Sequence, residues 1–114
     1  MHELPVVMDV IKIVNIEAEK RHFGHVSSIT LVLGELSSVM DESVQMYFEL
    51  LAENTPCEHA KLLFEHVPAT FRCSECGHEF PHEKAFDCPE CGGEALLVKG
   101  TGRELYIKAI DGDF

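Results

Sequence analysis

The chain has 114 residues, of which 46% are apolar, and its 20 Asp and Glu against 9 Lys and Arg give a formal charge of −11. This length and composition favour one globular domain, or one domain with a small appendage, and argue against a disordered chain. The acidity argues against nucleic-acid binding, which depends on clustered Lys and Arg, and no apolar run approaches the ~18 residues that a membrane span requires.

The first predicted element is a helix over residues 4–22. Apolar side chains recur there at spacings of three and four, which is typical of a helix with one buried face. That face consists of Leu4, Val7, Met8, Ile11, Val14 and Ala18, widened by Val6, Val10 and Ile13. Pro5 suits the first turn of a helix, and we expect Gly24 to end it.

Residues 26–36 then alternate with a period of two, which predicts a strand with one buried side. Ser38 and Asp41 resemble a capping box, and apolar residues at helical spacing up to Leu51 predict a second helix. Asn54-Thr55-Pro56 is expected to end that helix. Alternation over residues 61–67 and 104–110 predicts two more strands.

Residues 70–100 differ from the rest of the chain because they contain four cysteines and no long periodic run. So short a segment cannot bury an adequate apolar core of its own. We therefore predict an α+β fold in which two helices pack on a three-stranded sheet, with a four-cysteine zinc-ribbon module inserted before the last strand. The predicted domains are 1–69, the inserted module 70–100, and 101–114 as the last strand of the first domain.

The cysteines of this segment form two pairs, Cys73-x-x-Cys76 and Cys88-x-x-Cys91. Two such turns facing each other make a four-sulfur site, which selects zinc or, less often, iron. A closed site of four cysteines leaves no corner for water, so we predict a structural Zn²⁺ and no catalysis there. Cys57 stands alone and is interpreted as a packing thiol. Charged residues interrupt the first positions, so we expect no signal peptide and a cytoplasmic protein, in which paired cysteines bind metal rather than form disulfides.

The first three residues, Met1-His2-Glu3, offer a second kind of metal site. The amine of Met1 with the amide nitrogen and imidazole of His2 can fill three corners of a square plane, the geometry that Ni²⁺ and Cu²⁺ favour. Glu3 could occupy or orient toward the fourth corner. The alternative is a chain end that carries an incidental histidine.

Taken with the predicted body and the late cysteine module, these residues resemble the hydrogenase-maturation nickel metallochaperones, the HypA family. The resemblance covers essentially the whole chain. It extends to three shorter runs, namely Gly34-Glu35-Leu36-Ser37 into Glu42-Ser43, Phe48-Glu49-Leu50-Leu51, and Gly102-Arg103-Glu104-Leu105.

The resemblance implies a carrier rather than an enzyme, which accepts Ni²⁺ and delivers it to the large subunit of [NiFe]-hydrogenase. It implies a nickel-binding maturation GTPase as partner and, in some organisms, urease maturation proteins. It places nickel on Met1, His2 and Glu3, and zinc on Cys73, Cys76, Cys88 and Cys91. No interaction with nucleic acid or membrane is expected.

This chain departs from some members of the family at one point. Those members have a histidine directly after each C-x-x-C pair and are thought to exchange zinc ligands with pH. Gly77 and Gly92 stand at these positions here, so a pH-switched zinc site is not expected. The alternative function is a zinc-ribbon scaffold or interaction protein with no role in nickel transport.

Overall fold

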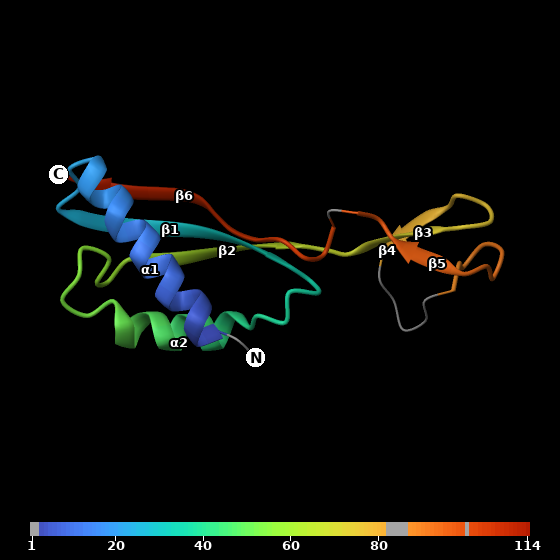
Figure 1. Cartoon of the computed structure of the whole chain (residues 1–114), viewed down its shortest axis with the longest axis horizontal. Helices are drawn as coiled ribbons and strands as arrows, with labels where there is room; N and C mark the ends of the chain where they lie inside the picture. Colours follow the sequence, from blue (N-terminus) through green and yellow to red (C-terminus); the bar gives the residue numbers. More distant parts are fainter. Residues whose placement is uncertain (1–2, 82–86, 100) are drawn as a thin grey trace. The chain divides into compact units, whose positions relative to one another are not determined.

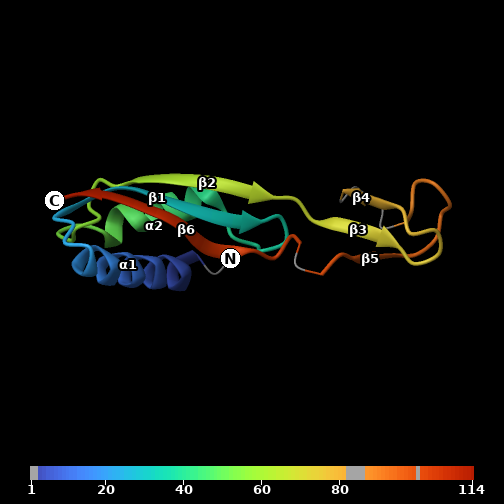
Figure 2. The same ribbon diagram turned by 90° about the horizontal axis from the view of Figure 1, so that it is seen from above.

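The computed structural model describes residues 3–81, 87–99 and 101–114 (Figures 1 and 2). The chain divides into two compact units. One, here called the body unit, consists of Met1–Val32, Ser38–Glu65 and Tyr106–Phe114; the other, the cysteine unit, consists of Leu33–Ser37 and His66–Leu105. The α+β class, the two helices and the four-cysteine cluster are as predicted. The domain boundaries drawn from the sequence stay a prediction.

The first helix, α1, spans Glu3–Lys20. The helix buries only part of the predicted apolar face. Leu4, Met8 and Ile13, which were expected to be buried, are exposed, whereas Val10 is buried as expected. The apolar stripe is therefore narrower than the sequence suggests, and it is centred on Val7, Ile11, Val14 and Ala18.

The end of α1 corrects another expectation, since His22 rather than Gly24 provides the left-handed residue, with φ 61°. The backbone N–H of His22 donates to the carbonyl of Glu19, and that of Phe23 donates to the carbonyl of Ala18 at 2.8 Å. This pair of hydrogen bonds is the Schellman motif, which satisfies the last carbonyls of a helix.

The body unit contains a three-stranded sheet of order β2-β1-β6, formed by β1 (His25–Gly34), β2 (Lys61–Val67) and β6 (Leu105–Asp113). Strands β1 and β2 run in the same direction, joined through α2, while β6 runs the opposite way (Figures 1 and 2). One apolar core joins this sheet to both helices. It includes Ile29, Leu31 and Leu62 from the strands and Val14 and Phe48 from the helices.

The prediction that β1 has one buried side is wrong. Every residue from Ile29 to Gly34 is buried, including Thr30 and Val32 on the side away from the helices. The strand lies between two neighbours, and the Lys108 Nζ on β6 reaches the carboxylate of Glu65 on β2 at 2.9 Å. Side chains from the outer strands thus cover the middle one.

The second helix, α2, spans Asp41–Leu51 and has Met40 as its N-cap residue, with no side-chain cap hydrogen bond. The predicted capping box of Ser38 and Asp41 is therefore wrong. Ser38 instead has a φ of 62°, two residues before the cap. Among the described residues, neither helix is long and apolar enough to cross a membrane.

The cysteine unit holds three short strands that the sequence did not predict: β3 (Thr70–Cys73), β4 (Glu79–Pro81) and β5 (Ala95–Leu97). They form a sheet of order β4-β3-β5, in which both outer strands pair antiparallel with β3. The register places Phe71 opposite Phe80 on one side and opposite Leu97 on the other. A small core of Ala69, Phe71, Cys73, Phe80 and Cys88 follows from this pairing.

Candidate metal centre

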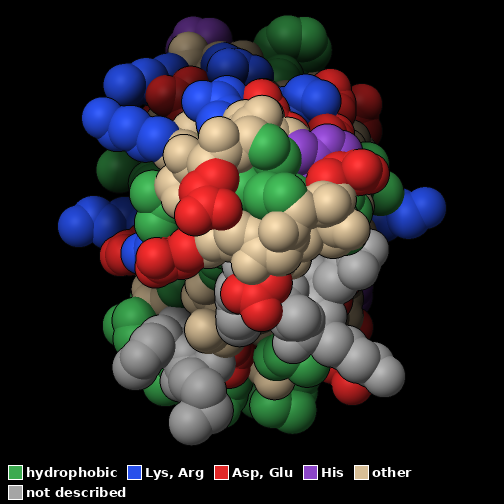
Figure 3. All heavy atoms as spheres, turned by 90° about the vertical axis from the view of Figure 1, so that its right-hand side faces the viewer, with side chains coloured by type: hydrophobic (Ala, Val, Ile, Leu, Met, Phe, Trp, Pro, Cys, Tyr) green, Lys and Arg blue, Asp and Glu red, His purple; other side chains and the backbone are tan. Residues whose placement is uncertain are grey.

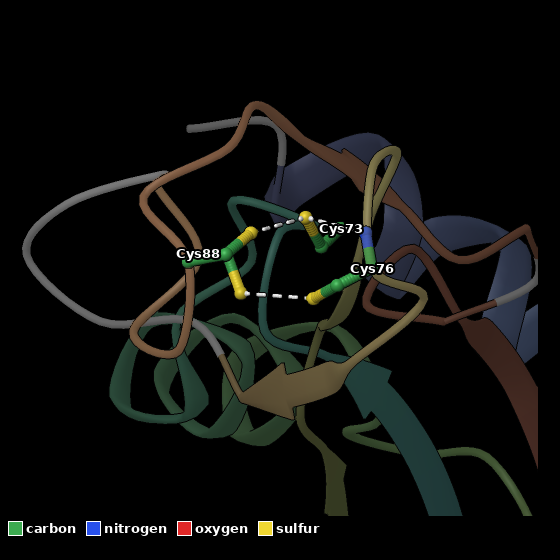
Figure 4. Close-up of side chains that lie close together, drawn as sticks. Cys73, Cys76 and Cys88 are labelled. Carbon is green, nitrogen blue, oxygen red and sulfur yellow. Dashed lines mark hydrogen bonds between the residues drawn. The ribbon is translucent and has the colours of Figure 1, made fainter.

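The four cysteines of the two C-x-x-C pairs converge on one point. Their sulfur atoms all lie within 4.8 Å of one another, and Figure 4 shows Cys73, Cys76 and Cys88 directed toward a common centre. The Sγ atoms of Cys73 and Cys91 are 3.4 Å apart, and those of Cys76 and Cys88 are 3.6 Å apart. The structure thus brings together all four residues that the spacing singled out.

Backbone turns hold the first cysteine of each pair. The Cys73 sulfur accepts hydrogen bonds from the backbone N–H groups of Glu75 and Cys76, and the Cys88 sulfur accepts one from that of Glu90, each at 3.4 Å. Gly77 and Gly92 close the two turns with φ of 78° and 75°, a region that other residues rarely adopt. Their N–H groups donate to the carbonyls of Cys73 and Cys88, at 3.0 and 2.8 Å.

Gly93 has a role that the sequence analysis missed. A Cβ at this position would lie 2.6 Å from the Glu75 carboxylate and 3.0 Å from the Cys73 sulfur. The second glycine of the Gly92-Gly93 dipeptide therefore lets the chain pass close to the sulfur cluster. The two consecutive glycines after the second cysteine pair are the sequence feature that could have predicted this close approach.

In the absence of a metal, the thiols of the cluster differ in pKa. The pKa of Cys73 falls to about 6, because the backbone N–H of Cys76, and then that of Glu75, stabilises its thiolate against the cost of burial. The pKa of Cys91 rises to about 12: the backbone N–H of Gly93 lowers it, but the neighbouring thiols of Cys73 and Cys76 raise it more. Four thiolates this close repel one another, and a divalent cation at their centre removes that conflict.

The cluster fits a tetrahedral ion. A tetrahedron with zinc–sulfur bonds of about 2.3 Å has sulfur–sulfur edges of about 3.8 Å. The two short separations measured here are slightly below that value, so small movements would complete the tetrahedron. A donor set of four thiolates suits Zn²⁺ or iron.

The cluster has a buried side and an exposed side. Cys73 and Cys88 are buried, whereas Cys76 and Cys91 are exposed. Figure 3 shows one face of the molecule, on which acidic side chains are interspersed with apolar and basic ones. Cys57 belongs to the body unit; it is buried, its pKa is raised by that burial, and its sulfur lies 3.1 Å from the hydroxyl of Thr55. It packs in the core, apart from the four-sulfur cluster.

Of the three residues expected to bind nickel, the structure describes one. Met1 and His2 lie outside the described residues. Glu3 begins α1 and is 8% exposed, and its carboxylate accepts a hydrogen bond from the backbone N–H of Met40 at 3.3 Å. The side chain is thus fixed between the first turns of the two helices.

Comparisons with known proteins agree with each other. Residues 1–112 match a family model described as "Hydrogenase/urease nickel incorporation, metallochaperone, hypA". A hydrogenase maturation factor HypA from Caldanaerobacter subterraneus subsp. tengcongensis is 43% identical over 112 residues, which cover 97% of this chain and 98% of that protein. The protein of the same name from Dehalococcoides mccartyi is 40% identical, with coverage of 99% and 95%.

Two solved structures share the fold. The solution structure of the Ni metallochaperone HypA from Helicobacter pylori superposes with a TM-score of 0.65 at 21% identity, covering 99% of this chain and 98% of that one. A second solution structure, of a HypA protein, gives a TM-score of 0.69 at 22% identity, with coverage of 98% and 96%.

Proposed function

Because this chain belongs to the HypA family of nickel-incorporation metallochaperones, we propose that it binds Ni²⁺ at its N-terminus and delivers it to the large subunit of [NiFe]-hydrogenase. As a member of that family it is a maturation factor rather than an enzyme. The proposal assigns nickel to the amine of Met1, the amide nitrogen and imidazole of His2, and Glu3. It assigns a structural Zn²⁺ to Cys73, Cys76, Cys88 and Cys91.

The observation that supports separate sites for nickel and zinc is the closed cluster of four sulfurs. A tetrahedral ion there uses all four protein ligands and has no open corner for a ligand exchange. A carrier must accept and release its cargo, so the transported ion needs a different and more open site. The nitrogen donors of the first two residues suit Ni²⁺ because they fill three corners of a square plane, and the fourth corner, occupied by Glu3 or facing it, can be opened to an incoming ligand.

The placement of Glu3 supports this assignment. Its carboxylate is held by the Met40 backbone N–H, so the position at which α1 begins is fixed relative to the start of α2. The carboxylate adds a negative charge beside the proposed donors, which favours a divalent cation. Cu²⁺ outcompetes Ni²⁺ at such donors, so selectivity rests on docking to partners and on which metal is available.

The proposed partners are a nickel-binding maturation GTPase, the hydrogenase large subunit and, in some organisms, urease maturation proteins, all in the cytoplasm. The sequence has no G-x-x-x-x-G-K-[ST] loop, so GTP hydrolysis belongs to the partner. The alternative, a scaffold that carries only zinc, predicts that nickel delivery does not depend on His2.

A test in cells separates the carrier from the scaffold. In a strain that lacks its own protein of this family, the native chain or its His2→Ala variant is produced, and the nickel content of the purified hydrogenase large subunit is measured. The carrier predicts nickel with the native chain and little with His2→Ala, while Glu19→Ala, an exposed change on α1, behaves like the native chain. Equal nickel with all three chains would support the scaffold.

A further inference from the structure

The outer side of α2 exposes apolar side chains that have no place in the core. This helix buries only Val44 and Phe48. Met46, Leu50 and Leu51 are 50%, 66% and 39% exposed. Met46 and Leu50 are four residues apart and therefore lie on the same side of the helix. A helix on the surface of a protein normally shows a polar outer side, so this second apolar stripe points to an interaction.

Two adjoining hollows follow the same helix within the body unit. The first, of about 410 Å³, lies between α2 and β2 and is lined by Asp41, Glu42, Gln45, Met46, Glu49 and Phe64. The second, of about 550 Å³, shares Gln45 and Glu49 with it and continues along α2 to Glu53 and to the turn that precedes β2. Because the two hollows share residues, they form one groove, here called the α2 groove.

The charge of the α2 groove selects its occupant. Five carboxylates line it, those of Asp41, Glu42, Glu49, Glu53 and Glu58, and none of the described lining residues is Lys or Arg. A second copy of this chain docking through the same face would bring like charges together, which disfavours it. Within the described residues, the only group placed to hold a metal ion is the cysteine cluster, so these carboxylates do not converge on a cation.

We propose that the α2 groove binds a basic amphipathic segment of a partner protein. Its Lys or Arg side chains pair with the carboxylates of the rim, and its apolar side chains cover Met46 and Phe64 in the groove and the exposed Leu50 one helical turn after Met46. This is the helix-in-groove mode of recognition, in which apolar contacts give affinity and charges set orientation and on-rate.

The groove starts near Glu3, one of the proposed nickel ligands. Asp41 lines it and directly follows Met40, whose backbone N–H donates to the Glu3 carboxylate. A segment seated in the groove therefore reaches the end of α2 that contacts Glu3. This relation to nickel rests on the proposed function, whereas the groove and its charge do not.

A peptide titration tests the proposal. The probe is a synthetic peptide of leucine and lysine arranged at helical spacing, added to the ¹⁵N-labelled full chain and followed by NMR. We expect the peptide to change the backbone amide chemical shifts of α2 and of residues 58–64 only. The Glu49→Lys, Glu53→Lys double variant should bind about tenfold more weakly. Asp9→Lys, Glu19→Lys on the exposed side of α1 changes net charge equally and should bind like the native chain.

A second pair of variants tests the apolar contact. Leu50→Ser should weaken peptide binding, whereas Ile16→Ser, a comparably exposed position on α1, should not. The proposal would be overturned if the α1 variants lost as much peptide affinity as the α2 variants. It would also be overturned by chemical-shift changes spread over the whole acidic surface, or by a scrambled peptide that binds as tightly as the amphipathic one. Self-association through α2 in sedimentation, with no peptide shifts there, would overturn it in favour of a second copy. Nickel affinity is measured on the same samples, so that a failure of the proposed nickel site can be told apart from a failure of the α2 groove to bind the peptide.

Discussion

The carboxylate of Glu3 accepts a hydrogen bond from the backbone N–H of Met40, across 3.3 Å. Met40 is the N-cap residue of α2. In a capping box this N–H is bound by a glutamate from the third position of the same helix. Here the glutamate comes from the first turn of the other helix, so one contact ties the start of α1 to the start of α2.

This contact predicts that Glu3→Ala destabilises the body unit even without any metal. Losing a hydrogen bond that a backbone N–H donates to a charged acceptor costs about 1 to 2 kcal/mol, and Glu3→Gln, which keeps an acceptor oxygen, should cost less. Urea denaturation of the metal-free chain, followed by circular dichroism, measures both. Glu19→Ala is the control, and a loss no larger for Glu3→Ala than for this control would contradict the contact.

Gly34 and Gly102 predict a second stability effect, in the cysteine unit. A Cβ on Gly34 would lie 2.3 Å from the carbonyl carbon of Gly102 and 2.6 Å from the backbone nitrogen of Arg103. Backbone atoms cannot move aside, so Gly34→Ala should cost about 2 to 3 kcal/mol or more. At Gly24 the nearest atom is 3.4 Å from such a Cβ, so Gly24→Ala serves as the matched control. Similar thermal unfolding of the two variants would show that the close approach is not formed.

Zinc content should depend on four of the five cysteines. Cys73→Ser and Cys88→Ser remove buried ligands and should abolish bound zinc, because a closed site needs all four sulfurs. Cys57→Ser should keep one zinc per chain, since this thiol packs in the body unit. Elemental analysis of the purified variants reads out the metal, including iron. Zinc retained without Cys73 would argue against the tetrahedral assignment.

Zinc affinity should fall as the pH falls, because protons compete with the metal for the thiolates. In the metal-free cluster the pKa of Cys73 is about 6 and that of Cys91 about 12. Above pH 6 Cys73 is already ionised, so zinc binding still has to displace the proton of Cys91. Below pH 6 Cys73 must lose its proton as well. Logarithmic affinity should therefore decline more steeply below about pH 6. Chelator competition across this range measures the slope, and an affinity independent of pH would contradict the mechanism.

The cysteine cluster was the most predictable part of the molecule. A C-x-x-C turn fixes two sulfurs locally, so the spacing alone identified Cys73, Cys76, Cys88 and Cys91. The three short strands around them were not predicted, because β4 and β5 have only three residues each and are too short to show alternating apolar and polar residues. Their pairing is imposed by the turns.

Elsewhere the sequence predicted the helices and strands better than the tertiary contacts that these elements make. Periodicity located both helices and the strand over residues 61–67, which depend on local pattern. It could not show that β1 lies in the middle of its sheet, which buries Thr30 and Val32. Nor could it show that Glu3 would replace a local cap on α2, since that contact joins residues 37 positions apart.

The central claim is that nickel is held by the first residues of the chain. Equilibrium nickel binding is measured for the native protein, for His2→Ala, and for a version acetylated at the Met1 amine, with zinc content recorded for each. We expect both changes to abolish tight nickel binding while zinc stays at one per chain, because each removes a nitrogen donor and neither touches the four sulfurs. Unchanged nickel affinity in the acetylated version would contradict the N-terminal site.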